Sequence, residues 1–148
     1  MTPADIFNNV AAPNVAAQGG DVGDIRLAVN AILSLDALMG VIHADRYRRG
    51  LETGDDIVFR NKLAAQHFEI RLVRDAAFAL KHGELRPAAR LVQRAEQIKP
   101  VGAFDSAVFD PAVFDTKKRV WIEANDAQHT RLADVVRRDV LGVLQGMI

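Results

Sequence analysis

HFEIRLVRDAAFALKHG, residues 67 to 83, is the stretch that decides the fold, because it sets charged side chains on an otherwise apolar helix. Its apolar residues recur at spacings of three and four, which is the pattern of a helix packed on one face. They are Ile70, Val73, Ala77 and Leu80. Gly83 follows where a C-terminal cap with a positive φ is expected. The pattern predicts a core helix from about residue 68 to the glycine.

The polar residues of this helix are its candidate catalytic groups. Asp75 and His82 are seven residues apart and share nearly the same helical angle, and Arg74 and Lys81 form a parallel row. In a catalytic interpretation His82 is the general acid or base, the two cations stabilise phosphate charge and Asp75 orients the histidine. In the structural alternative, Lys81 and His82 simply meet the negative end of the helix dipole. The structural alternative is the favoured one.

A second long helix is predicted from about residue 24 to 47, capped by Asp21 or Asp24. Its apolar residues are Ile25, Ala28, Ile32, Leu35, Met39 and Ile42. Asp36 and His43 interrupt this stretch, again seven residues apart. Since buried polar groups need partners, they are expected to form a second polar cluster, a hydrogen-bond network between helices. A contribution to an active site is the alternative.

The rest of the chain completes one domain over residues 1–148. Residues 1–20 predict an N-terminal arm, loosely attached, with a short helix that Pro13 stops. Residues 24–83 are the core helices, the third of which is capped by Asp55 and carries Ile57, Val58, Leu63 and Ala64. Residues 132–146 hold a closing amphipathic helix. The predicted fold is mainly α, a bundle of about four to five helices.

A small β-hairpin or β-rich insertion is expected between residues 88 and 130. Arg119 to Glu123 is typical of a strand. Phe104, Phe109 and Phe114 recur every five residues, which fits neither helix nor strand and indicates a loop whose rings anchor to the bundle. For residues 88–98, local propensity favours a helix.

Composition excludes several function classes. The chain has 148 residues, is 49% apolar and contains no cysteine, so it is long enough for a core and has neither disulfides nor thiolate sites. Its apolar run from 27 to 42 is shorter than the ~20 residues that span a bilayer. No membrane association is expected, and a cytoplasmic location is the default.

Ligand motifs are weak as well. The four histidines lack metal-ligand spacings, and the glycines at 19, 20 and 23 lack the lysine and strand of a phosphate loop, so no metal and no cofactor are predicted. The net charge is zero, which gives no long-range attraction to nucleic acid. RNA binding would depend on local basic clusters at residues 46–49, 117–119 and 137–138.

The R-D-x-A-x-x-x-K-H pattern, here Arg74 to His82, resembles a helix in a widespread group of small uncharacterised bacterial and phage-borne proteins. The match covers roughly residues 25 to 145. In that group the segment after the K-H helix is extended, so the resemblance implies a strand over residues 90–98, and this interpretation is preferred to a helix.

The helical part is also similar in outline to the HEPN superfamily, helical bundles that commonly dimerise and include metal-independent ribonucleases with an R-x4-6-H motif. Here seven residues separate Arg74 from His82. Residues eight apart differ by about 80° and by roughly 12 Å along the axis, which departs from the motif.

Two functional hypotheses follow. The first is a non-catalytic interaction or structural module that forms a homodimer, because the apolar stripes of the 24–47 helix and the closing helix look too wide for one bundle to bury. The second is a HEPN-like RNA-processing or toxin-type nuclease that acts through His82 with Arg74, Lys81 and Asp75.

Overall fold

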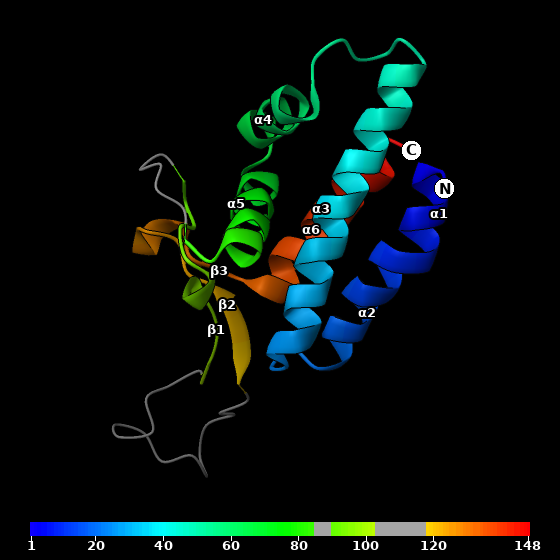
Figure 1. Cartoon of the computed structure of the whole chain (residues 1–148). Helices are drawn as coiled ribbons and strands as arrows, with labels where there is room; N and C mark the ends of the chain where they lie inside the picture. The colour runs from blue at the N-terminus through cyan, green and yellow to red at the C-terminus, as the bar shows by residue number, and fades with distance from the viewer. Residues whose placement is uncertain (85–89, 103–117) are drawn as a thin grey trace.

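The computed structural model describes residues 1–84, 90–102 and 118–148, which form a helical bundle with a small sheet beside it (Figure 1). The helices are α1 (Pro3–Ile6), α2 (Ala12–Gly20), α3 (Ile25–Arg48), α4 (Asp56–Gln66), α5 (Phe68–His82) and α6 (Ala133–Gln145). The strands are β1 (Ile98–Val101), β2 (Arg119–Ile122) and β3 (Arg131–Leu132). The predicted class, mainly α with a small β insertion, is confirmed.

Helix α3 is the central element of the bundle. Asp24 caps it by accepting hydrogen bonds from the backbone N–H groups of Arg26 and Leu27. Its apolar residues pack against α2, α5 and α6, which lie around it in Figure 1. Among the described residues, α3 alone is long and apolar enough to cross a membrane, and half of that apolar stretch is buried within the protein.

Helices α4 and α5 complete the core on one side of α3. Val73 and Ala77 of α5 are fully buried, as predicted, whereas Leu80 is only half-buried. Gly83 ends α5 with φ of +77°, a conformation that favours glycine. In α4 the predicted apolar face is partly wrong: Leu63 and Ala64 are buried, but Ile57 and Val58 are exposed, and Phe59 occupies the core.

The N-terminal arm is well packed, so the expectation of a loose attachment is wrong. Pro13 does not stop the helix, because a π-helical turn, η1 (Phe7–Ala11), precedes it and α2 continues to Gly20. Proline lacks an N–H, and the wider turn accommodates that loss within a continuous helical segment. Ala11 and Val15 are buried against the bundle. Residues 1–20 are therefore part of the core.

The three strands pair in the order β1-β2-β3, and both pairs are antiparallel. Ile98 lies opposite Ile122, and both are buried. The backbone N–H of Val120 donates to the carbonyl of Val22 at 2.9 Å, which ties the sheet to the loop before α3. The strand predicted at 119–123 is confirmed, and β3 extends the sheet just beyond the predicted insertion.

Neither interpretation of residues 90–98 is correct over its length. The backbone is irregular up to a short 3-10 turn, η2 (Ala95–Gln97), and only Ile98 belongs to β1. The side-chain oxygen of Gln97 accepts from the backbone N–H groups of Gln93 and Arg94, both at 2.8 Å. This side chain satisfies groups that a helix or strand would otherwise pair. Residues 85–89 and the three phenylalanines at 104, 109 and 114 lie outside the described residues.

Two leucines of α5 test this packing. We expect Leu72→Ala to lower the free energy of unfolding by about 2–5 kcal/mol, since Leu72 is fully buried. Leu80→Ala should cost clearly less, because the half-buried side chain leaves a smaller cavity. Urea denaturation of both variants measures the difference, and equal losses would contradict the placement of α5.

Candidate functional site

Asp75 is the most constrained of the candidate catalytic residues. Its side chain is fully buried in the middle of α5. One carboxylate oxygen, Oδ1, accepts hydrogen bonds from Nε and Nη2 of Arg74 at 2.9 and 2.8 Å and from Nη1 of Arg90 at 2.9 Å. The other, Oδ2, accepts from the backbone N–H of Leu91 at 2.8 Å. The carboxylate therefore fastens α5 to the segment that leads into β1.

Arg74 extends this arrangement to α4. Its Nη1 donates to Oδ1 of Asn61 at 2.7 Å, while its other contacts hold Asp75. The guanidinium of Arg90 lies 4.6 Å from the centre of the Phe78 ring, a cation–π contact. We call Asn61, Arg74, Asp75 and Arg90 the Asp75 cluster. It joins α4, α5 and the irregular segment after α5.

Lys81 belongs to a different cluster, built on Asp36. The Asp36 carboxylate is buried in α3 and accepts hydrogen bonds from Lys81 Nζ of α5 and from Arg60 Nη1 of α4. Arg60 also donates from Nε to Oδ2 of Asp56 at 2.7 Å. We call Asp36, Asp56, Arg60 and Lys81 the Asp36 cluster. One buried carboxylate thus holds three helices together.

His43 lies at the edge of the Asp36 cluster. Its Nε2 is 2.9 Å from the carbonyl oxygen of Gly54, and because a carbonyl only accepts, Nε2 carries the proton. Its Nδ1 lies 4.0 Å from Oδ1 of Asp56. Asp36 and His43 are thus connected through Arg60 and Asp56 rather than by direct contact.

His82 is the candidate that the structure leaves outside both clusters. It is exposed in the last turn of α5, and its ring is stacked on Phe78 with centroids 5.9 Å apart. The two cavities that Arg74 lines, described below, include neither His82 nor Lys81. Of the four candidates, the structure brings together Arg74 and Asp75, and it places Lys81 and His82 elsewhere.

Sequence reasoning missed Arg60, Asn61 and Arg90. The pairing of Arg60 with Asp56 could have been predicted, since the two residues are four apart and such pairs meet on a helix surface. Arg90 had no such signal, because it lies in an irregular segment without periodicity. Among the described residues, no group of three or more metal-binding side chains is arranged to hold a metal ion.

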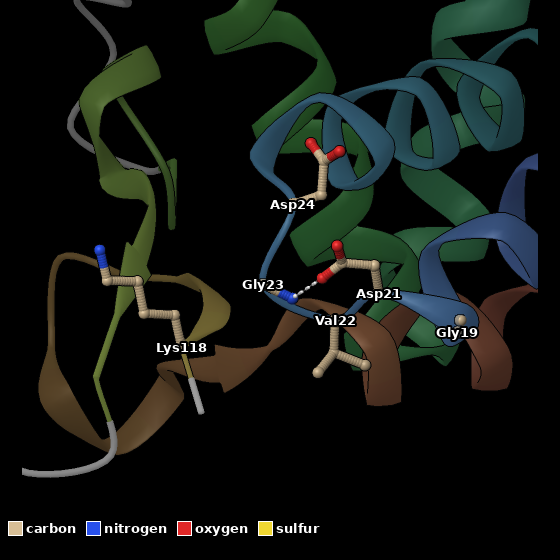
Figure 2. A pocket seen from close by; sticks show the side chains of 7 residues that line it. Gly19, Asp21, Val22, Gly23, Asp24 and Lys118 are labelled. Carbon is tan, nitrogen blue, oxygen red and sulfur yellow. Dashed lines mark hydrogen bonds between the residues drawn. The ribbon is translucent and has the colours of Figure 1, made fainter. Parts of the chain in front are cut away.

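The glycine-containing loop before α3 lines a pocket of about 620 Å³, seen in Figure 2. Asp21 and Asp24 lie on one side and Lys118 on the other. Both carboxylates are already used: Asp21 accepts from the N–H of Gly23 at 3.1 Å, and Asp24 caps α3. A Cβ on Gly23 would lie 2.6 Å from the carbonyl oxygen of Lys118, so the glycine allows the loop to approach β2. These contacts shape the loop that leads into α3.

A buried arginine fixes α2 to α6. Arg137 of α6 donates from Nη1 to the carbonyl of Val15 in α2. Burial lowers the pKa of the Arg137 guanidinium below its ordinary value, although nearby Asp134 opposes this shift. Gln18 of α2 is also buried, and its side-chain amide has no hydrogen-bond partner among the described residues. The site is an interhelical contact that no sequence pattern revealed.

The Asp75 cluster can be tested by removing its charge. We expect Asp75→Asn to lower the free energy of unfolding by about 3–5 kcal/mol, because two guanidinium groups lose their shared carboxylate. The control is Asp139→Asn, whose partner Arg138 is exposed, and its cost should stay below about 1 kcal/mol. Similar costs for the two variants in chemical denaturation would refute a structural role for Asp75.

Gly40 tests the Asp36 cluster. A Cβ at this position would lie 2.9 Å from Nη2 of Arg60, so Gly40→Ala should destabilise the protein. In an Arg60→Met background the same substitution should instead stabilise it by up to about 1 kcal/mol, the helix propensity gain of alanine over glycine. Thermal or urea unfolding of the double-mutant cycle measures both effects. If Gly40→Ala stabilised the protein that retains Arg60, the close approach of Arg60 Nη2 to position 40 would be contradicted.

Comparison with known proteins adds no assignment to this geometry. No family model, curated protein or solved structure matches the chain.

Proposed function

We propose that the chain is a non-catalytic interaction module that acts as a homodimer. The observation that carries this proposal is the state of the candidate catalytic groups: Asp36 and Asp75 are buried, and each holds two cations from different parts of the chain. In the catalytic interpretation Asp75 orients His82, but the Asp75 carboxylate is held by Arg74 and Arg90, and the His82 ring is stacked on Phe78. Carboxylates enclosed in this way support the fold and are poorly placed for chemistry.

The proposed dimer surface lies at the end of the molecule where α3 connects to α4 (Figure 1). Among the described residues, the exposed large apolar side chains are Met1, Tyr47, Leu51, Ile57, Val58, Val101 and Ile148. Four of these seven fall between residues 47 and 58, and each of the four is more than half exposed. We call Tyr47, Leu51, Ile57 and Val58 the apolar tip. Clustered exposed apolar side chains mark interaction surfaces.

The charges around the apolar tip favour a second copy of the chain as its partner. Arg48 and Arg49 both pair with Asp45, and Arg46 and Lys62 both approach Glu52. Asp55 and Asp56 at the start of α4 bring the acidic groups to four, equal to these four basic groups, so two such surfaces can meet about a twofold axis without strong repulsion. A nucleic acid or an anionic membrane would instead favour an excess of positive charge.

The apolar tip is a different surface from the apolar stripes of the 24–47 helix and the closing helix, on which the sequence-based prediction of a dimer rested. Most of the apolar stripe of α3 is covered by α2, α5 and α6 within one chain, and Val136, Val140 and Leu144 of α6 are buried as well. The homodimer remains a prediction, now based on exposed side chains. A cytoplasmic location is part of the same proposal.

The HEPN-like nuclease is the alternative, and it depends on the sequence resemblance. It would require Arg74 to act together with His82. In the described structure Arg74 is engaged with Asp75 and Asn61, and His82 is stacked on Phe78. These contacts favour the non-catalytic module.

Light scattering of the purified protein tests the dimer. At tens of micromolar we expect a mass of twice the 16.2 kDa of one chain, reduced towards one chain by Val58→Glu. Val58 is the third residue of α4, where a glutamate favours the helix N-terminus, so the variant should fold. Gln66→Glu, an exposed change of equal charge at the far end of α4, is the control and should remain dimeric. A monomeric wild-type protein would refute the proposal.

An RNA assay separates the two functions. Purified protein is incubated with total RNA in EDTA, beside a His82→Ala variant. We expect no cleavage by either protein. Cleavage that EDTA does not stop and that His82→Ala abolishes would establish the nuclease instead.

A further inference from the structure

A groove between α4 and α5 has a lining suited to an anion. Its volume is about 290 Å³, and it is lined by Asn61, Ala64, Ala65, Arg71 and Arg74. A smaller cavity of about 20 Å³ shares Asn61 and Arg74 with it and is also lined by Ile57, Arg60, Phe78 and Arg90. The two spaces lie on the solvent side of the Asp75 cluster. The alanines keep the larger one open, because their side chains are small.

The polar groups that line the groove are hydrogen-bond donors. Arg71 and Arg74 contribute guanidinium groups, which have no acceptor atom. The side-chain oxygen of Asn61 already accepts from Arg74, so this amide has its NH₂ group left to offer. No carboxylate is among the residues that line the groove. Such a lining favours a ligand rich in acceptor oxygens.

The charge near the groove is positive, although the chain as a whole is neutral. Arg74 and Arg90 share the single carboxylate of Asp75, whose two oxygens are both occupied. Two guanidinium charges and one carboxylate leave an excess of one positive charge at this point. Arg71 lines the same groove. A bound anion would balance this excess.

Arg74 is also held in place before any ligand arrives. A guanidinium has five N–H groups, and Arg74 uses three of them, two for Asp75 and one for Asn61. The remaining two can donate to a ligand from a fixed side chain, which lowers the entropic cost of binding. Arginine in this state is well suited to the paired oxygens of a phosphate group.

We propose that this groove binds the phosphate group of a small molecule. Its volume is near the lower end of the about 300–1,000 Å³ of ligand pockets, which suits a compact group. A nucleic-acid polymer is disfavoured because the net charge of zero supplies no attraction along its length. None of the residues that line the groove belongs to the apolar tip, although Ile57 of the tip lines the smaller cavity. Phosphate binding does not depend on the proposed dimer.

The test is calorimetric titration of the full chain with inorganic phosphate and pyrophosphate at low salt. Asn61→Asp and Ala65→Glu each place a carboxylate in the groove. Both positions are exposed, and an aspartate at 61 can still accept from Arg74, so the fold should be kept. Gln66→Glu is the matched control, because it adds the same charge on α4 at an exposed position that does not line the groove.

We expect at least one of the two phosphate compounds to bind the wild-type protein and the Gln66→Glu control equally. Binding should weaken at least about tenfold in both groove variants. Three results would overturn the proposal: no binding of either compound to the wild-type protein at about 10 mM, affinity unchanged in both groove variants, or binding of a single-stranded RNA oligonucleotide alone. Far-UV circular dichroism of each variant checks that the fold is unchanged.

Discussion

The buried carboxylate of Asp75 is the interaction around which this side of the protein is arranged. A carboxylate out of contact with water has to be paired and fully hydrogen bonded, and removal of its partners would leave an uncompensated charge. Asp75 meets this requirement with Arg74, with Arg90 and with the backbone of Leu91. These contacts hold residues 90–91 against the middle of α5.

Asp36 repeats the same solution on α3. Its partners Arg60 and Lys81 come from α4 and α5, so the three helices share one buried anion. Together the two carboxylates explain why polar residues interrupt otherwise apolar helices. A polar stripe of this kind resembles the wall of an active site in sequence, since both contain acidic and basic side chains at helical spacing. The partners of each carboxylate distinguish the two cases.

The groove and the apolar tip are the two surfaces that these clusters leave available. The Asp75 cluster pairs one carboxylate with two guanidinium groups, and this excess of guanidinium groups gives the groove its donor-rich lining. The apolar tip lies beyond the Asp36 cluster, where α3 connects to α4. There the last turn of α3 and the first turn of α4 carry exposed apolar side chains. A phosphate ligand and a second copy of the chain could therefore bind at different positions along α4, the ligand beside Asn61 and Ala65 and the second copy at the first turn.

Local sequence determined the class of the fold and most helix boundaries. Asp24, Asp55 and Gly83 act at helix ends through contacts within a few residues, so their roles follow from short-range chemistry. Tertiary structure decided the rest. Asp75 and His82 share a helical angle, yet one is buried and the other exposed, because the core covers the middle of α5 and not its end. The pairing of Asp75 with Arg90 and of Asp36 with Lys81 joins residues 15 and 45 positions apart, and no local pattern specifies such contacts.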